Sequence, residues 1–159
     1  MAMTLNMNDA VVALRSFGRR YGEVVNGPVG DEAWEGKVRA TPPKGGSALA
    51  HVLFATEYLR ALTKALTAMP STKEPVLTTP HLSEPAADAD PTKLIADLKA
   101  AGASAGDALD ARSHDDYDRS FTFDGKLVEI RSVVETVVQR CVAGLKLADQ
   151  AIQDAASGR

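Results

Sequence analysis

The sequence is short of the side chains that carry out most enzyme and metal chemistry. Its 159 residues include 3 histidines, 1 cysteine and 1 tryptophan. A single cysteine excludes a disulfide framework and any zinc site built from several thiolates. The histidines are His51, His81 and His114, so a site with three histidine ligands would need all of them. These counts leave few residues on which a reaction could depend.

A surplus of basic residues is also missing. The chain has 18 Lys and Arg against 21 Asp and Glu, which gives a net charge of -3. Binding to a phosphate backbone favours the opposite balance, so we expect no nucleic-acid partner. Residues 1–10 lack the basic and apolar regions of a secretion signal, and no stretch approaches the ~20 apolar residues of a membrane span. We therefore expect a soluble, cytoplasmic protein with no membrane partner.

Four segments carry the three-and-four spacing of apolar residues that is typical of amphipathic helices. Asn8 or Asp9 is expected to cap the first helix, Ser47 the second and Asp90 the third, because these side chains can accept hydrogen bonds from free backbone N–H groups. Alanine and glycine on the inner face of the third helix indicate a close approach to a neighbouring helix. The predicted helices cover residues 10–24, 48–69, 91–108 and 127–155.

The stretch between the second and third helices, residues 70–91, has prolines at 70, 75, 80, 85 and 91. Such spacing of proline prevents a helix. At ~3.3 Å per residue a linker of this size reaches on the order of 70 Å, which exceeds the ~30 Å length of a 20-residue helix. The linker can therefore cross the whole molecule, which permits an up-down-down-up order of the four helices.

Residues 119–126, before the fourth helix, alternate aromatic and polar side chains and contain the turn signal Asp124-Gly125. This pattern predicts a short extended piece or a hairpin. The predicted fold class is thus all-α: one domain over residues 1–159, built as a four-helix bundle with the proline-rich crossover at 70–91 and a short extended piece before the last helix.

The fourth helix has more apolar residues than a single packing groove needs. A second edge accompanies its main stripe, which starts at Leu127. A face of this width indicates either a central position in the fold or a subunit interface, and we expect a homodimer. The second edge consists of Val133, Val138, Val142 and Leu145.

His51 is the first candidate for a functional residue, because it lies in the first turns of the second helix beside the apolar stripe. There it could point into the bundle as a metal ligand or an acid–base group, or it could be a histidine at the edge of the core that bonds to a neighbour. Trp34, in the preceding linker, is expected to pack over the end of the bundle or to form a pocket wall beside His51. With Tyr58 of the same helix, these two residues are the candidate ligand-binding set.

His114 and Cys141 are weaker candidates. The carboxylates of Asp115, Asp116 and Asp118 follow His114, and hard cations favour oxygen-rich loops, so His114 is a second candidate metal ligand. The segment lacks the spacing of a calcium loop, however, and a solvated acidic turn is the alternative. Cys141 lies on the apolar stripe of the last helix, where cysteine behaves as a small hydrophobic residue, so we expect it to serve packing.

Taken in chain order, these features form a pattern. A helix is followed by a linker with Trp34, by a helix with the early His51 and an aromatic–aliphatic run to Leu62, by a polar helix, and by Phe121–Gly125 before a long last helix. This layout resembles the DinB-like superfamily, which includes YfiT-like metal-dependent hydrolases, thiol transferases acting with bacillithiol or mycothiol, and mycothiol-dependent maleylpyruvate isomerase. The resemblance covers most of the chain.

The resemblance implies a divalent metal, zinc or nickel, held by a histidine at the position of His51 and by a His-x-x-x-His pair on the last helix. The last helix has no histidine, and the candidate positions within 136–143 do not offer two good ligands. We therefore predict an incomplete metal site and no cofactor. The alternative is a zinc or nickel site assembled from His51, His114 and nearby carboxylates.

Three functions remain open at this point, and the sequence does not decide whether the protein is an enzyme. The first is binding of a small molecule or a partner without metal catalysis. The second is a metal-dependent hydrolase or thiol transferase, in which His51 is a ligand and the metal lowers the pKa of a bound water or thiol. The third is a homodimeric interaction scaffold that packs through the last helix.

Overall fold

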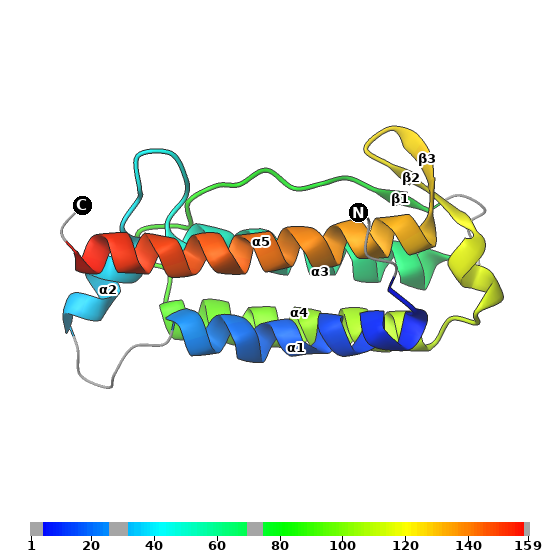
Figure 1. Cartoon of the computed structure of the whole chain (residues 1–159), viewed down its shortest axis with the longest axis horizontal. Coiled ribbons are helices and arrows are strands. Elements are labelled where there is room, and N and C mark those ends of the chain that lie inside the picture. Colours follow the sequence, from blue (N-terminus) through cyan, green and yellow to red (C-terminus); the bar gives the residue numbers. More distant parts are fainter. Residues whose placement is uncertain (1–4, 26–31, 70–74, 158–159) are drawn as a thin grey trace.

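The fold is mostly helical, as the sequence predicts, and it carries one small sheet (Figure 1). It was obtained as a computed structural model that describes residues 5–25, 32–69 and 75–157. The helices are α1 (Met7–Val25), α2 (Glu32–Arg39), α3 (Ala48–Ala68), α4 (Pro91–Asp110) and α5 (Ile130–Ala156), with a 3-10 turn η1 (Asp115–Asp118); the strands are β1 (Val76–Leu77), β2 (Ser120–Phe123) and β3 (Lys126–Glu129).

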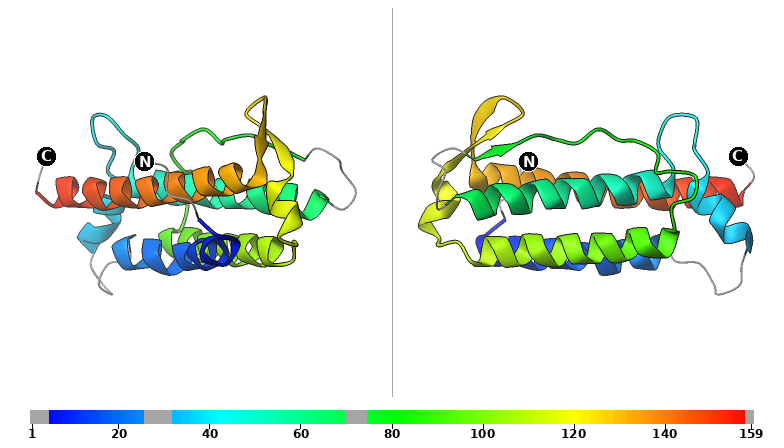
Figure 2. Two further views of the ribbon diagram at one scale, coloured as in Figure 1. Left: turned by 45° about the vertical axis from the view of Figure 1, so that its right-hand side comes forward. Right: turned by 180° about the vertical axis from the view of Figure 1, so that it is seen from behind.

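The four long helices lie in two layers. Figures 1 and 2 show α3 beside α5 in one layer and α1 beside α4 in the other. α1 packs against α4 and α5, and α3 packs against the same two helices, so the apolar faces of all four meet in one core. None of the described helices is both long and apolar enough to span a membrane.

Polar side chains fix where the long helices begin. The Ser47 hydroxyl accepts a hydrogen bond from the N–H of Ala50 at 3.1 Å, and the Asp90 carboxylate accepts one from the N–H of Thr92 at 3.0 Å, as predicted for both caps. The cap of α1 was expected at Asn8 or Asp9. Instead the helix starts one turn earlier, because the Asn6 side chain accepts from the N–H of Asp9 at 2.8 Å.

α1 and α4 approach closely because glycine faces the partner helix in both of them. A Cβ atom at Gly18 would lie 2.5 Å from the Cα of Lys99, and one at Gly102 would lie 2.7 Å from the carbonyl oxygen of Leu14. No side chain fits at such distances from a backbone. The predicted close approach through the small residues of this helix is therefore confirmed.

The sheet confirms the predicted hairpin and corrects the predicted start of the last helix. β2 pairs antiparallel with β3 through a turn in which Asp124 and Gly125 have φ of 50° and 83°, so the hairpin is confirmed. The fourth helix, however, does not start at Leu127. That residue belongs to β3, where it is 64% exposed, and the helix begins at Ile130. The spacing of three between Leu127 and Ile130 imitates a helical stripe, but pairing with β2 requires residues 126–129 to be extended.

β1 is a strand that the sequence did not predict. It lies within the predicted crossover and pairs in parallel with β2, so that the strand order is β1-β2-β3. The described part of the crossover, residues 75–90, has no helix, as its prolines predict. Residues 70–74, the first part of the predicted linker, lie outside the described residues.

Polar side chains fasten the crossover at several places, including the hairpin and the start of α3. The N–H and the hydroxyl of Thr79 both donate to the carboxylate of Asp124, at 2.7 and 2.6 Å. Further along, the carboxylate of Glu84 accepts from the backbone N–H of Ser47 at 2.9 Å and from its hydroxyl at 2.5 Å. The crossover is thereby tied to the hairpin near one end and to the start of α3 near the other.

α2 corrects the prediction that Trp34 lies in a linker. Trp34 and Val38 are spaced i, i+4 and both pack against the core, while Lys37 and Arg39 in the last turn complement the helix dipole. The Arg39 guanidinium also donates to the carbonyl of Ala89 at the end of the crossover. The helix is short, so its apolar spacing and basic last turn do not stand out in the sequence.

The broad apolar face of α5 packs against other elements of the same chain. Val133 and Val138 are buried, and Val142 and Leu145 are half-buried against the core, because α5 contacts α1, α2, α3, η1 and the sheet. A central position therefore accounts for the width of this face. The homodimer stays a prediction.

The glycine contact between α1 and α4 can be tested by Gly102→Ala. Overpacking against the Leu14 carbonyl is expected to cost more than the about 1 kcal/mol that alanine gains over glycine in a helix, so the free energy of unfolding should fall by about 1–3 kcal/mol. Urea denaturation measures the change.

Gly36→Ala in α2 is the matched control. A Cβ at Gly36 meets no atom within 4 Å, so this substitution should leave the stability unchanged or raise it. Equal behaviour of the two variants would contradict the close approach at Gly102.

Candidate functional site

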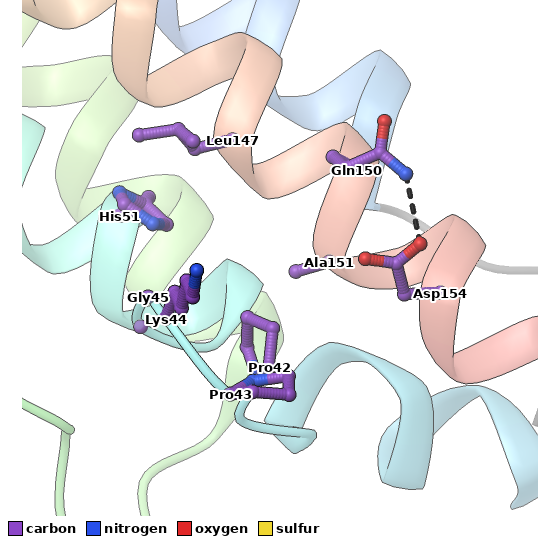
Figure 3. A pocket seen from close by; sticks show the side chains of 10 residues that line it. Pro42, Pro43, Lys44, Gly45, His51, Leu147, Gln150, Ala151 and Asp154 are labelled. Atoms are coloured by element: carbon purple, nitrogen blue, oxygen red, sulfur yellow. Dashed lines mark hydrogen bonds between the residues drawn. The ribbon is translucent and has the colours of Figure 1, made fainter. Parts of the chain in front are cut away.

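A pocket of about 380 Å³ opens between the loop before α3, the first turn of α3 and the last turns of α5 (Figure 3). Prolines, glycines, a leucine and an alanine form most of its walls. Lys44, Gln150 and Asp154 are its polar residues, apart from His51. The full lining consists of Pro42, Pro43, Lys44, Gly45, Gly46, His51, Leu147, Gln150, Ala151 and Asp154.

His51 is the buried polar group of this pocket. Its side chain lines the cavity, yet the residue is only 5% exposed. Its backbone N–H donates to the carbonyl of Ser47 as part of the helix, but no hydrogen bond from the described part of the chain reaches the imidazole ring. Burial lowers the pKa of His51, and the charge of Glu84 opposes this only in part. The imidazole is therefore neutral at pH 7 and retains unused hydrogen-bonding capacity.

The wall opposite His51 comes from α5, where small residues make room. A Cβ at Gly144 would lie 2.7 Å from the hydroxyl oxygen of Tyr21 and 3.9 Å from the Nδ1 of His51. The Tyr21 hydroxyl donates to the carbonyl of Cys141 at 2.5 Å, and burial raises the pKa of this phenol far above its usual range. Gly144 thus leaves room for the hydroxyl of the buried Tyr21 near His51, an arrangement that the sequence did not predict.

The crossover borders the pocket at Gly46. A Cβ at Gly46 would meet Leu82 at 3.0 Å and the Glu84 carboxylate at 3.4 Å. Because Glu84 also binds the N–H and hydroxyl of Ser47, the crossover holds the loop before α3 in place. The shape of the pocket therefore depends on a segment more than thirty residues further along the chain.

The structure does not bring Trp34 and Tyr58 together with His51. Trp34 packs against the core from α2 and does not line the pocket, which agrees with the first of its two predicted roles. Tyr58 is buried two turns further along α3, where its hydroxyl lies 3.1 Å from the Oγ1 of Thr79. Since Thr79 also donates to Asp124, Tyr58 serves the attachment of the crossover.

His114 lies far from His51. It is exposed at the start of η1, and Figure 1 shows η1 and the first turn of α3 at opposite ends of the molecule. Two of the neighbouring carboxylates already have partners: Asp116 accepts from the backbone N–H of Ser113 and pairs with Arg119, and Asp118 accepts from Arg131 at 3.0 Å. A joint metal site of the two histidines is therefore excluded by geometry.

Cys141 has the packing role that its position predicts. The side chain is fully buried, and burial raises the pKa of its thiol to about 12. A thiol with this pKa is protonated at neutral pH, and the thiolate is the nucleophilic form. Cys141 therefore does not act as a nucleophile.

The residues around His51 do not fit a three-ligand metal centre. Of the α5 residues near it, Gly144, Leu147 and Ala151 provide no ligand atom, and Asp154 provides one carboxylate, which accepts from Gln150; all four lie beyond the positions 136–143 considered from sequence. In the described part of the chain, no group of three or more His, Cys, Asp or Glu side chains could hold a metal ion.

The sequence analysis identified His51 but not the residues that enclose it. Pro42, Pro43, Lys44 and the two glycines that follow were interpreted only as a linker before α3. Leu147, at 53% exposed on the last turns of α5, was likewise given no role. A proline–glycine loop directly before a capped helix with an early histidine was the one local signal of this pocket.

Comparison with protein-family models finds no match for the chain, and comparison with curated proteins finds none either.

The burial of His51 predicts a pH dependence of stability. Its pKa in the folded protein is below the ordinary value of 6.5, so protonation favours the unfolded chain. The free energy of unfolding should therefore fall as the pH drops below 6.5 and be unaffected by this residue above it. Urea denaturation between pH 7.5 and 5 measures the slope, which should be reduced in His51→Gln.

His81→Gln is the control, because His81 is exposed in the crossover and should leave the slope unchanged. Parallel stability curves for the parent protein and His51→Gln would contradict the burial of a neutral imidazole.

Proposed function

We propose that the protein binds a small molecule in the pocket at His51, and that it does so without a metal. The observation that carries the proposal is the imidazole ring, which is almost fully buried, lines the pocket and has no hydrogen-bond partner in the described residues. The ring nitrogens are not among the fully buried atoms that lack a partner, so they are open to the pocket. A ligand in the pocket can therefore bond to this ring.

The size and lining of the pocket suit a small organic ligand. A volume of about 380 Å³ falls in the range of small-molecule sites, which are mostly apolar with a few placed polar groups. The apolar body of the ligand would contact Pro42, Leu147 and Ala151. One hydrogen-bonding group would reach His51.

The arrangement of the helices supports this location. We infer an up-down-down-up bundle in which the crossover returns along the molecule from the end of α3 to the start of α4, as the course of the chain in Figures 1 and 2 suggests. Sites in helical bundles form between facing helices, and this pocket lies between α3 and α5. Membership of the DinB-like superfamily remains a hypothesis that rests on the sequence pattern.

The metal-dependent alternative, a hydrolase or a thiol transferase, has less support. It requires several ligands around His51, and the α5 residues that line the pocket provide a single carboxylate, that of Asp154. A single histidine does not hold zinc or nickel in the three-point coordination of a catalytic site. We therefore place the function in binding.

The proposal predicts that a neutral amphipathic probe binds at this pocket. Titration of 1-octanol into 15N-labelled protein should shift the backbone amides of Gly45, Gly46 and Ala151 before others. Leu147→Asn should weaken binding about fivefold, because the ligand loses roughly 1 kcal/mol of apolar contact. Leu147 is 53% exposed, so its replacement leaves the core intact.

Val12→Asn is the matched control, since Val12 is an exposed apolar residue on α1 that does not line the pocket. It should bind the probe as the parent protein does. Absence of any saturable shift at the pocket amides, or equal weakening by both substitutions, would overturn the proposed function.

A further inference from the structure

The carboxylate of Asp154 is a charged group of the pocket that has no charged partner. It accepts one hydrogen bond from the side-chain amide of Gln150 at 2.8 Å, and that donor is neutral. No Lys, Arg or His side chain within residues 5–25, 32–69 and 75–157 forms an ion pair with it. Figure 3 shows one carboxylate oxygen bonded to Gln150 and the other pointing toward the cavity. The second oxygen is therefore open to a ligand.

The surroundings of this carboxylate are also negative. Asp154 lies in the last turn of α5, where the helix dipole places partial negative charge, and this turn has no basic residue. At the loop, a Cβ on Gly46 would lie 3.4 Å from the carboxylate of Glu84, which accepts from the neutral N–H and hydroxyl of Ser47. Both effects favour a cation in the pocket.

Lys44, the lysine of the pocket lining, does not neutralise Asp154. Its side chain is exposed, and it pairs with no carboxylate in the described part of the chain. An exposed ammonium is strongly hydrated on a flexible stem, and salt screens its charge. Lys44 therefore leaves room for another cation at Asp154.

The pocket extends along one face of α5. Leu147, Ala151 and Asp154 follow each other at spacings of four and three residues, so they share a face of the helix. A rise of about 1.5 Å per residue separates the first of them from the last by roughly 10 Å. Figure 3 shows His51 on the side of Leu147, with Asp154 on the other side and Ala151 between. A ligand along this face meets a hydrogen-bonding ring at one end and a carboxylate at the other.

We propose that the ligand of this pocket is an aliphatic amine whose ammonium bonds to the carboxylate of Asp154 and whose far end places a hydrogen-bonding group at His51. This inference rests on the proposed function and adds the charge and the length of the ligand to it. The His51 ring is almost fully buried and has no partner among the described residues, so both ends of the pocket offer an open group. An ammonium has three donors and can bond to the free oxygen of Asp154 without displacing Gln150.

Other groups fit the Asp154 end of the pocket less well. A carboxylate at this end would meet Asp154 as a like charge. An apolar end would remove water from the Asp154 carboxylate and supply no hydrogen bond in return. An ammonium avoids both costs, and the apolar chain behind it contacts Ala151 and Leu147.

Three eight-carbon alcohols test the inference, because they differ only at the end away from the hydroxyl. That end is a methyl in 1-octanol, an ammonium in 8-amino-1-octanol and a carboxylate in 8-hydroxyoctanoate. Each is titrated into 15N-labelled full-length protein at pH 7.5, and dissociation constants are taken from the amide shifts of Gly45 and Ala151. We expect the amine to bind about fivefold more tightly than 1-octanol, and the carboxylate to bind more weakly than 1-octanol. Asp154→Asn should remove the preference for the amine.

Asp149→Asn is the matched control, because Asp149 is an exposed aspartate of α5 that does not line the pocket and its replacement removes the same charge. It should keep the preference for the amine. Equal affinities of 8-amino-1-octanol and 1-octanol for the parent protein, or an unchanged preference in Asp154→Asn, would overturn the amine while leaving small-molecule binding in place. Failure of all three probes to shift the pocket amides would overturn the proposed function as well.

Discussion

The chain has to travel back along the molecule between α3 and α4, because α3 ends at the end of the molecule opposite to the start of α4 (Figures 1 and 2). The described part of this segment, residues 75–90, has no helix, and strand pairing and polar contacts hold it in place. Thr79 binds Asp124 of the hairpin, and Glu84 binds Ser47 at the start of α3. The second attachment both completes the cap of α3 and fixes the loop that forms one side of the pocket. The loop that forms one side of the pocket is thus held by a segment from elsewhere in the chain.

The burial of His51 is the chemical consequence of this arrangement. Its ring lies between the loop and α5 and is largely buried, so the neutral form is favoured, and no described residue bonds to its nitrogens. The neighbouring polar groups do not compensate, since Tyr21 donates to the Cys141 carbonyl and Glu84 is engaged by Ser47. The ring nitrogens are not fully buried, however, so a ligand in the pocket can reach them and supply the bond.

The sequence predicted the long helices well because their signals are local. Ser47 and Asp90 cap where expected, and the glycines of α4 mark its close approach to α1. Leu127 was predicted to start the last helix because it lies three residues before Ile130, a spacing that also arises by chance outside helices. Pairing with β2 places it in a strand instead. The candidate site was predicted only as far as His51. Lys44, Leu147 and Ala151 belong to it through contacts between distant parts of the chain, and neither composition nor spacing encodes such contacts.

The proposed function depends most directly on the protonation and hydrogen bonding of the His51 imidazole ring. Long-range 1H–15N spectra of the His51 side chain at pH 7 report its protonation, its hydrogen bonding and any metal ligation. We predict a neutral ring whose 15N shifts are unchanged by one equivalent of zinc and move on saturation with 1-octanol. A ring that is protonated at pH 7, or one whose shifts respond to stoichiometric zinc, would contradict it.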